Sequence, residues 1–232
     1  MCGKFTAMAS WADIVAFAEA QPEYYSDLHS DLSNDQIITY RVMSSLPVIL
    51  WDAAQGKRRI VSMRWGFPNP RNPNIPQPIH ARAETIDTTP AFADVFTLGQ
   101  RGIVLVRNFN EGRELENGKT EQHVIALGDA AAAGIAFLYR GFDLGGPAPL
   151  NACVMATVPA NTLIAALPTD RMPAMLAEPD WATWLGEDPA TPAQAKSCLK
   201  TVEGAAWTMT RETRAATQKR ARPTVSDPKG LF

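Results

Sequence analysis

The sequence has few of the residues that cross-link a chain or anchor it in a membrane. Its 232 residues include only three cysteines, Cys2, Cys153 and Cys198, and no Cys-x-x-Cys pair. This excludes a disulfide scaffold and a zinc site built on such pairs, and it favours a reducing compartment. The longest apolar run, residues 130–139, has ten residues, against the roughly 18 that a membrane helix needs. We therefore expect no membrane segment and, since no apolar stretch follows Lys4, no signal peptide.

Neither sign of charge predominates in the sequence. The chain has 22 Lys and Arg against 24 Asp and Glu, a formal charge of −2, while 46% of residues are hydrophobic. This is a globular composition that excludes a disordered chain and a polycation. Any contact with nucleic acid must then come from a local basic patch. Residues 211–222 form one candidate, with five basic residues against Glu212, although a solvated basic tail is the simpler explanation.

The pattern of short apolar runs and turn signals predicts an α+β fold with many short antiparallel strands. Strands are expected at 47–52, 59–65, 102–107, 122–127, 134–139, 151–157 and 207–210. The runs 122–127 and 134–139 are expected to form a hairpin, and the proline-rich residues 66–78 an irregular loop. Helices are expected near 10–18, 91–96, 161–167, 180–185 and 193–202. We assign one domain to residues 1–210 and a basic tail to residues 211–232.

Cys2 is the residue with the most distinctive chemistry. Cells remove Met1 when the second side chain is small, and the mature chain would then begin with a free amine and a thiol on one residue. The amine is partly neutral near pH 7 and the thiol is easily activated. Such a 1,2-aminothiol can attack an amide, or it can condense with an aldehyde to form a thiazolidine ring. A small residue after the start codon is the plain alternative.

Several short motifs occur in a specific order along nearly the whole chain. They are Met1-Cys2-Gly3-Lys4-Phe5, Trp65-Gly66-Phe67-Pro68, Ala81-Arg82-Ala83-Glu84-Thr85, Thr157, Asp170-Arg171-Met172-Pro173 and Asp180-Trp181-Ala182-Thr183-Trp184-Leu185. In this order the sequence resembles the SRAP (SOS response-associated peptidase) family. The resemblance implies a single α+β domain with a β-barrel-like core and peripheral helices.

The resemblance also implies a reaction. Cys2, exposed after removal of Met1, would capture the ring-opened aldehyde of an abasic site in single-stranded DNA as a thiazolidine crosslink. Self-peptidase and lyase activities are further implied. Glu111, within Asn108-Phe109-Asn110-Glu111-Gly112, would act as acid or base in imine formation, unless it is a surface residue of a polar loop. The residues that would bind DNA are Lys4, Arg41, Trp65, Phe67, Arg82, Thr157 and Arg171.

The sequence departs from the family pattern at two active-site positions. His80 stands where the family has asparagine, and Thr169 where it has the histidine linked to ring opening and crosslink release. His80 either restores an imidazole for acid–base work or marks a site that has lost its chemistry. The two rings Trp65 and Phe67 either stack on bases or belong to the core. His123 has no motif around it and is interpreted as structural or surface.

Three functions therefore compete. The first is an enzyme that crosslinks abasic sites, the second is a catalytically impaired single-stranded DNA-binding module, and the third is an N-terminal-nucleophile amidohydrolase. We expect no metal, no small-molecule cofactor, a monomer, and a cytoplasmic location with nucleoid association when DNA is bound.

Overall fold

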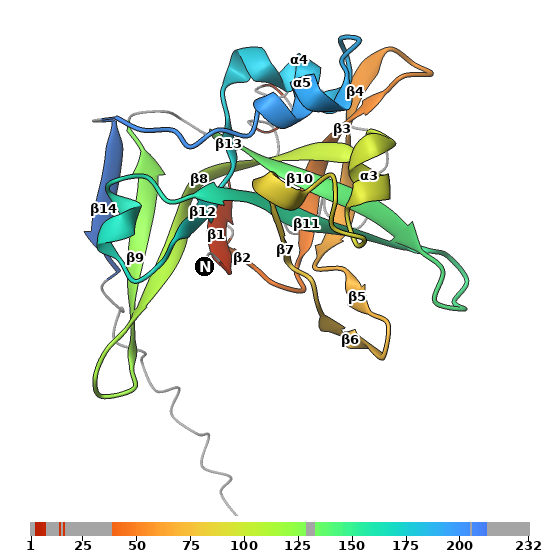
Figure 1. Ribbon diagram of the computed structural model, residues 1–232. Coiled ribbons are helices and arrows are strands. Elements are labelled where there is room, and N and C mark those ends of the chain that lie inside the picture. Colours follow the sequence, from red (N-terminus) through yellow and green to blue (C-terminus); the bar gives the residue numbers. More distant parts are fainter. Residues whose placement is uncertain are drawn as a thin grey trace, which may run out of the picture.

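The computed structural model describes residues 3–7, 14, 16, 39–128, 133–204 and 206–212. Strands predominate in these ranges and the helices are short (Figure 1). The strands are β1 (Lys4–Ala7), β2 (Thr39–Arg41), β3 (Ser45–Asp52), β4 (Lys57–Trp65), β5 (Pro68–Asn69), β6 (Asn72–Pro76), β7 (His80–Arg82), β8 (Arg101–Glu114), β9 (Thr120–Leu127), β10 (Ala133–Phe142), β11 (Leu150–Pro159), β12 (Arg171–Pro173), β13 (Met175–Leu176) and β14 (Trp207–Arg211). The helices are α3 (Ala93–Thr97), α4 (Trp181–Leu185) and α5 (Pro192–Ser197), with 3-10 turns η1 (Ala83–Thr85), η2 (Ile164–Ala166) and η3 (Glu178–Asp180).

Five strands form a ring that holds the core. The first half of β8 pairs with β10, β10 with β11, β11 with β4 and β4 with β3, and β3 returns to β8 through the pair Ile49 and Ile103. Residues 101–106 of β8 are all buried, because the ring covers one face of the strand and α4 packs on the other. The indole of Trp184 on α4 donates to the carbonyl of Gly102 at 2.9 Å. A Cβ at Gly134 would lie 3.0 Å from the ring of Trp181 on α4, so a larger residue there would require the indole to shift.

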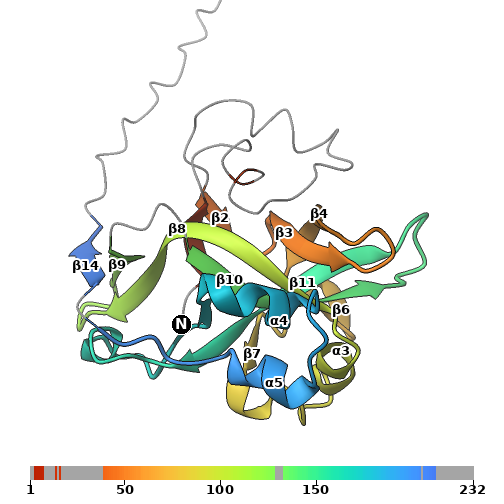
Figure 2. The same cartoon turned by 90° about the horizontal axis from the view of Figure 1, so that it is seen from above.

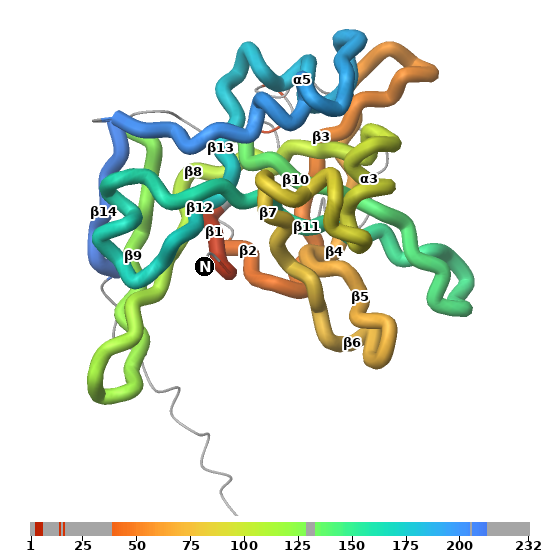
Figure 3. Tube along the Cα trace, viewed as in Figure 1, coloured from red at the N-terminus to blue at the C-terminus, as the bar shows by residue number. Residues whose placement is uncertain are grey.

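The second half of β8 leaves the ring and continues the same sheet as an antiparallel extension in the order β2–β1–β8–β9–β14 (Figure 2). This part of the sheet is called the wing. Its front face carries the register partners Phe5, Phe109 and Ile125, which are at most 1% exposed. Because side chains alternate along a strand, Lys4 and Asn110, the next pair along, point to the back face. The chain trace shows the N-terminal strand in the middle of the molecule (Figure 3).

Two expectations from the sequence are wrong. The strands β9 and β10 do not form a hairpin, because each pairs with a different half of the long strand β8. The expected irregular loop at 66–78 contains a small hairpin, β5–β6, paired at Pro68 with Pro76 and Asn69 with Asn72. Prolines are tolerated there because the hairpin is a separate two-stranded sheet with free edges.

The α+β single-domain expectation is confirmed, and most strands lie close to their expected positions. Helices are shorter than expected: residues 161–167 contain only the 3-10 turn η2, and α5 ends at Ser197. The expected helix at 10–18 lies outside the described residues apart from 14 and 16, which are helical, and the tail beyond Glu212 lies outside them as well. In the described part of the chain, no helix has the length and apolarity needed to cross a membrane.

Candidate active site

Glu111 lies on the front face of the wing. It is one residue beyond Asn110 on β8, so its side chain points to the face of Phe109 and is 1% exposed. The long strand β8 explains the burial: the segment that looks like a polar loop in the sequence is held between β1 and β9. The interpretation of Glu111 as a surface loop residue is therefore not supported. A buried carboxylate costs free energy unless it is solvated by the protein, so the position suits a functional group.

The N-terminal strand runs directly beside Glu111. Lys4 pairs with Asn110 and Phe5 with Phe109, so Gly3, the residue before Lys4, follows the strand toward the level of Glu111. Cys2, the predicted nucleophile, lies outside the described residues. The geometry of β1 thus brings Gly3, the first described residue, next to the strand segment that carries the buried carboxylate.

His80 begins β7 and is connected to β1 through aromatic rings. Its imidazole lies edge-on to Trp65, with ring centroids 6.4 Å apart, and Trp65 lies 5.0 Å from Phe5. Phe5 is on the same face of β1 as Gly3, because the two residues are two positions apart. His80 is therefore linked to the N-terminal strand through packed rings, and Glu111 is linked to it through the pairing of β8 with β1.

Arg82 and Arg171 have different environments. Arg82 ends β7 with an exposed side chain. The guanidinium of Arg171 is buried and forms a fork with Glu84, Nη1 to Oε1 at 2.5 Å and Nη2 to Oε2 at 2.9 Å, while Nη2 also donates to the carbonyl of Thr157 at 2.6 Å. This hydrogen bonding lowers the pKa of Glu84. Arg82 is accessible to a ligand, whereas Arg171 is already paired.

Two threonines predicted in the site have their hydroxyls engaged. The buried Thr157 donates to the carbonyl of Ala81 at 3.4 Å. Thr169 is half-buried, and its hydroxyl donates to the carbonyl of Arg171 at 3.3 Å and accepts from the amide of the same residue at 3.4 Å. Thr169 thus shapes the turn that leads into β12.

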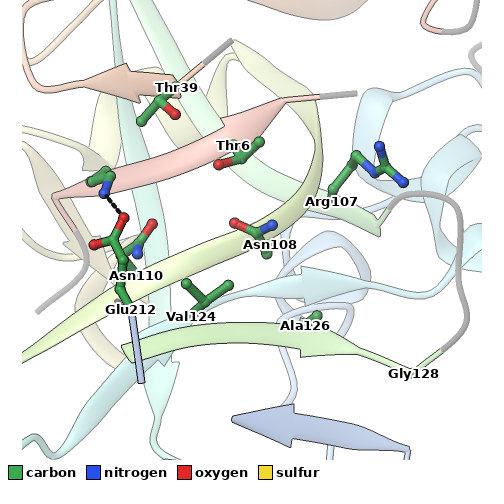
Figure 4. Close-up of a pocket in the computed structure, with 10 residues that line it drawn as sticks. Thr6, Thr39, Arg107, Asn108, Asn110, Val124, Ala126, Gly128 and Glu212 are labelled. Atoms are coloured by element: carbon green, nitrogen blue, oxygen red, sulfur yellow. Dashed lines mark hydrogen bonds and ion pairs between the residues drawn. The ribbon is translucent and has the colours of Figure 1, made fainter. Parts of the chain in front are cut away.

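Lys4 and Arg41 point to the back face of the wing, away from Glu111. They are register partners, and Lys4 donates to Glu212 at 2.6 Å. A groove of about 440 Å³ opens here, with the Lys4–Glu212 pair at one end and Arg107 at the other (Figure 4). Its remaining lining residues are Thr6, Thr39, Asn108, Asn110, Val124, Ala126 and Gly128. The structure therefore separates these two predicted DNA-binding cations from the buried carboxylate.

The remaining predicted residues lie in the core. Trp65 is 0% exposed and its indole donates to the carbonyl of Ile79 at 3.3 Å, while Phe67 is 3% exposed and packs 5.0 Å from Phe142. Bases cannot stack on rings buried in this way, so we interpret both as core residues. The thiols of Cys153 and Cys198 are also buried, and burial raises the pKa of each. Neither is suited to act as a nucleophile.

The structure pairs Glu111 with His123, which the sequence led us to interpret as structural or surface, and connects His123 to two further charged residues, Glu121 and Arg211. His123 is the register partner of Glu111, its Nε2 atom lies 3.2 Å from Oε1 of Glu121, and Oε2 of Glu121 lies 2.8 Å from Nε of Arg211. The alternation of Glu121 and His123 along β9 was the available signal. It could not be used because the expected partner strand was wrong. Among the described residues, no cluster of His, Cys, Asp and Glu has the arrangement of a metal site.

Comparison with known proteins identifies the family. Residues 1–216 match the family described as SOS response associated peptidase (SRAP). A solved protein from Bacteroides thetaiotaomicron is 19% identical, with a TM-score of 0.74 over 90% of this chain and 91% of the other. A protein from Bordetella bronchiseptica is 16% identical, with a TM-score of 0.74 over 92% of this chain and 100% of the other. A phage-related protein from the same organism is 18% identical, with a TM-score of 0.66 over 92% and 95% of the two chains.

No curated protein matches this chain. The solved structures are too distant in sequence to indicate more than the fold, whereas the family match covers nearly the whole chain. The chain belongs to the SOS response associated peptidase family.

Proposed function

We propose that the protein captures abasic sites in single-stranded DNA through a covalent bond to Cys2. Family membership supports a role in the response to DNA damage that involves abasic-site binding. The observation that carries the finer proposal is the buried Glu111 beside the N-terminal strand, one register step beyond the pair Lys4 and Asn110. A carboxylate in this position can exchange protons with the amine of a chain that begins at Cys2.

The chemistry balances with groups of this chain and the DNA alone. After removal of Met1, the amine nitrogen of Cys2 attacks the aldehyde carbon of the opened sugar, and a proton passes from nitrogen to the former carbonyl oxygen. The resulting hydroxyl leaves as water when it receives a proton from Glu111, and the nitrogen gives its remaining proton back to Glu111 as the imine forms. The sulfur of Cys2 then adds to the imine carbon while the thiol proton passes to the nitrogen, which closes the thiazolidine. Glu111 is the group we assign to both proton transfers at the nitrogen and the hydroxyl.

The DNA strand would be held mainly by Arg82. Its exposed guanidinium on β7 is suited to a phosphate contact, while Arg171 holds Glu84 and Thr157 and so fixes the segment that carries Arg82. We therefore assign Arg171 a positioning role and keep Lys4 and Arg41 as candidates for phosphate contacts on the back face. His80, whose ring lies edge-on to Trp65, is assigned as a second acid–base group.

A non-covalent single-stranded DNA-binding module is the second candidate. It is favoured by Thr169, whose hydroxyl is occupied by the backbone of Arg171 and so supplies no imidazole where the family pattern has one. In this case Arg82 and the other exposed cations would still bind the strand, with an affinity that falls steeply as salt rises.

Intact mass measurement separates the two candidates. The purified protein is incubated with single-stranded DNA that carries one abasic site, with intact DNA as the control. The covalent proposal predicts a protein without Met1 plus the DNA, less one water, and no such product for Cys2→Ala. A protein without Met1 that binds the strand but forms no adduct would support the binding module instead. Release of ammonia from glutamine would revive the amidohydrolase.

A further inference from the structure

We propose that the β5–β6 hairpin, residues 68–76, is a second contact for single-stranded DNA, with Arg71 on the phosphate backbone and Ile75 on a base. The inference rests on the proposed function, because it extends the path of the same strand beyond Arg82. Figure 1 shows the hairpin extending away from the main sheet, directly before β7 in the chain. Long proline-rich connections in a compact domain are usually functional or disordered, and this one has a defined hairpin structure.

The part of the chain that contains the hairpin has charge of one sign. Residues 53–83 include six basic residues and no acidic residue, although the whole chain has a formal charge of −2. Arg58 is paired with Glu187, and Arg59 lies 3.7 Å from Asp52. Arg71 is exposed at the tip of the hairpin, and no ion pair among the described residues includes it. The tip therefore carries a positive charge that attracts a polyanion.

Hydrogen bonds within the tip leave donors as its outward polar groups. The side-chain oxygen of Asn69 accepts from the amide of Arg71 at 2.8 Å, and that of Asn72 accepts from the amide of Asn74 at 3.1 Å. The Nδ2 groups of Asn69 and Asn72 have no acceptor among the described residues. Phosphate oxygens between ester bonds accept hydrogen bonds, so a guanidinium beside two amide donors suits the backbone of DNA.

The hairpin is anchored to the body of the protein. Arg64 on β4 donates from Nη1 to the carbonyl of Pro73 at 3.2 Å and from Nε to the carbonyl of Gly66 at 3.3 Å. Gly66 has a φ of +108°, and a Cβ there would lie 2.5 Å from the Cβ of Pro76. The prolines of the hairpin fix their own φ angles. A segment that is held in this way loses little conformational entropy when it binds a ligand.

Ile75 gives the hairpin an apolar surface. Its side chain is 48% exposed, and only four large hydrophobic residues are exposed in the described part of the chain. Pro76 faces Gly66, and side chains alternate along a strand, so Ile75 points away from the body. Aliphatic side chains pack between bases in DNA complexes. A single strand offers base faces that a duplex keeps stacked, so this contact favours the single strand.

The test measures binding of the full chain to an intact single strand, which has no abasic site and so forms no adduct. The eleven residues from Arg71 to Arg82 span at most roughly 36–40 Å, so a strand of about 30 nucleotides reaches both. Arg71→Ala should weaken binding severalfold and lower the slope of log K against log salt by about 0.7, the loss of one phosphate contact. Ile75→Ser should weaken binding to the single strand at an unchanged slope and leave binding to a duplex unchanged.

Lys119→Ala is the matched control for Arg71→Ala. Lys119 is an exposed cation at the tip of the β8–β9 hairpin, and its amide donates to the side-chain oxygen of Asn117 at 3.0 Å, the same local contact that Arg71 makes. Its hairpin also carries Glu116, so its loss should change binding little. All these side chains are exposed, and unfolding curves should match that of the wild type. Equal losses in Lys119→Ala and Arg71→Ala, or an unchanged affinity and slope in Arg71→Ala, would overturn the proposal.

The remaining outcomes separate this proposal from the covalent one. Unchanged single-strand binding in Ile75→Ser, or an equal loss on single strand and duplex, would overturn the base contact. A wild type that binds intact strands through Arg71 but forms no adduct with an abasic site would contradict the covalent function and support the hairpin contact. A wild type that forms the adduct but does not bind intact strands would contradict the hairpin contact alone.

Discussion

Arg171 and Glu84 are joined by two hydrogen bonds, and the same guanidinium donates to the carbonyl of Thr157. These contacts connect the start of β12, the turn η1 and the middle of the sheet at β11. Arg82 lies two residues before Glu84 and is exposed. The two arginines therefore have different roles: Arg171 fixes the segment, and Arg82 is exposed to solvent.

Replacement of the two arginines should therefore have different effects. Arg171→Ala leaves the carbonyl of Thr157 without this donor, so we expect it to lower the free energy of unfolding by about 1–3 kcal/mol. Arg82→Ala should change that free energy by less than about 0.5 kcal/mol but weaken binding to single-stranded DNA. Loss of one phosphate contact should reduce the slope of log K against log salt by about 0.7. Chemical denaturation and salt-dependent binding measure the two effects, and equal destabilisation by both variants would contradict this division.

The pairing also makes stability depend on pH. Hydrogen bonding from Arg171 lowers the pKa of Glu84 in the folded protein, so its contribution is present above the unfolded pKa and is lost as pH falls through the folded one. We expect the free energy of unfolding to decrease across this acidic range, and Glu84→Gln to flatten the decrease. The effect should be small, because the Glu84 side chain is 48% exposed and solvent screens the pair. Denaturation series at several acidic pH values test this, with Glu116→Gln, at a described surface position outside the ion pairs reported above, as the control.

The pair Lys4–Glu212 leads to a third prediction. The two charges lie 2.6 Å apart at the end of the back-face groove, with side chains 22% and 33% exposed. If Lys4 contacts phosphate, Glu212 competes with the DNA for it. Glu212→Gln should then strengthen binding by roughly 0.2–1 kcal/mol, the range of exposed ion pairs, and Lys4→Met should weaken it. Binding that does not change in either variant would remove the back face from the DNA path.

The sequence predicted the strands of the ring and, in the wing, β9 and β14, but not β1, β2 or the second half of β8. Runs such as Ile103-Val104-Leu105-Val106 are buried on both faces, and such runs are visible without knowledge of partners. The second half of β8 has no such run. It is covered instead by its partners β1 and β9, which alternate polar with apolar residues. Pairing across distant segments is set by tertiary packing, which the order of turn signals does not reveal.

The candidate site was predictable only where a motif marked it. The ordered motifs gave Cys2, Arg82 and Arg171 their assignments. A motif does not show whether a side chain contacts a ligand or packs in the core, and burial decides between these roles. Trp65 belongs to the core because Phe5 and Phe137 pack against it. The pairing of His123 with Glu111 was not predicted, because a register is a property of the folded sheet.

Glu111 itself gives the most direct test of the proposed chemistry. Glu111→Gln keeps the size of the side chain and one acceptor oxygen but can neither take up nor release a proton, so we expect adduct formation to fall about 10²–10⁴-fold, the usual contribution of a general acid or base. Glu114→Gln is the matched control, because Glu114 lies on the same strand with an exposed side chain. The rate is measured by following the covalent product on single-stranded DNA with one abasic site, and unfolding curves show whether both variants fold alike. A buried carboxylate that were only structural would change stability more than rate. If Glu111→Gln reacts at the wild-type rate, another group must transfer the proton, and His80 is the next candidate.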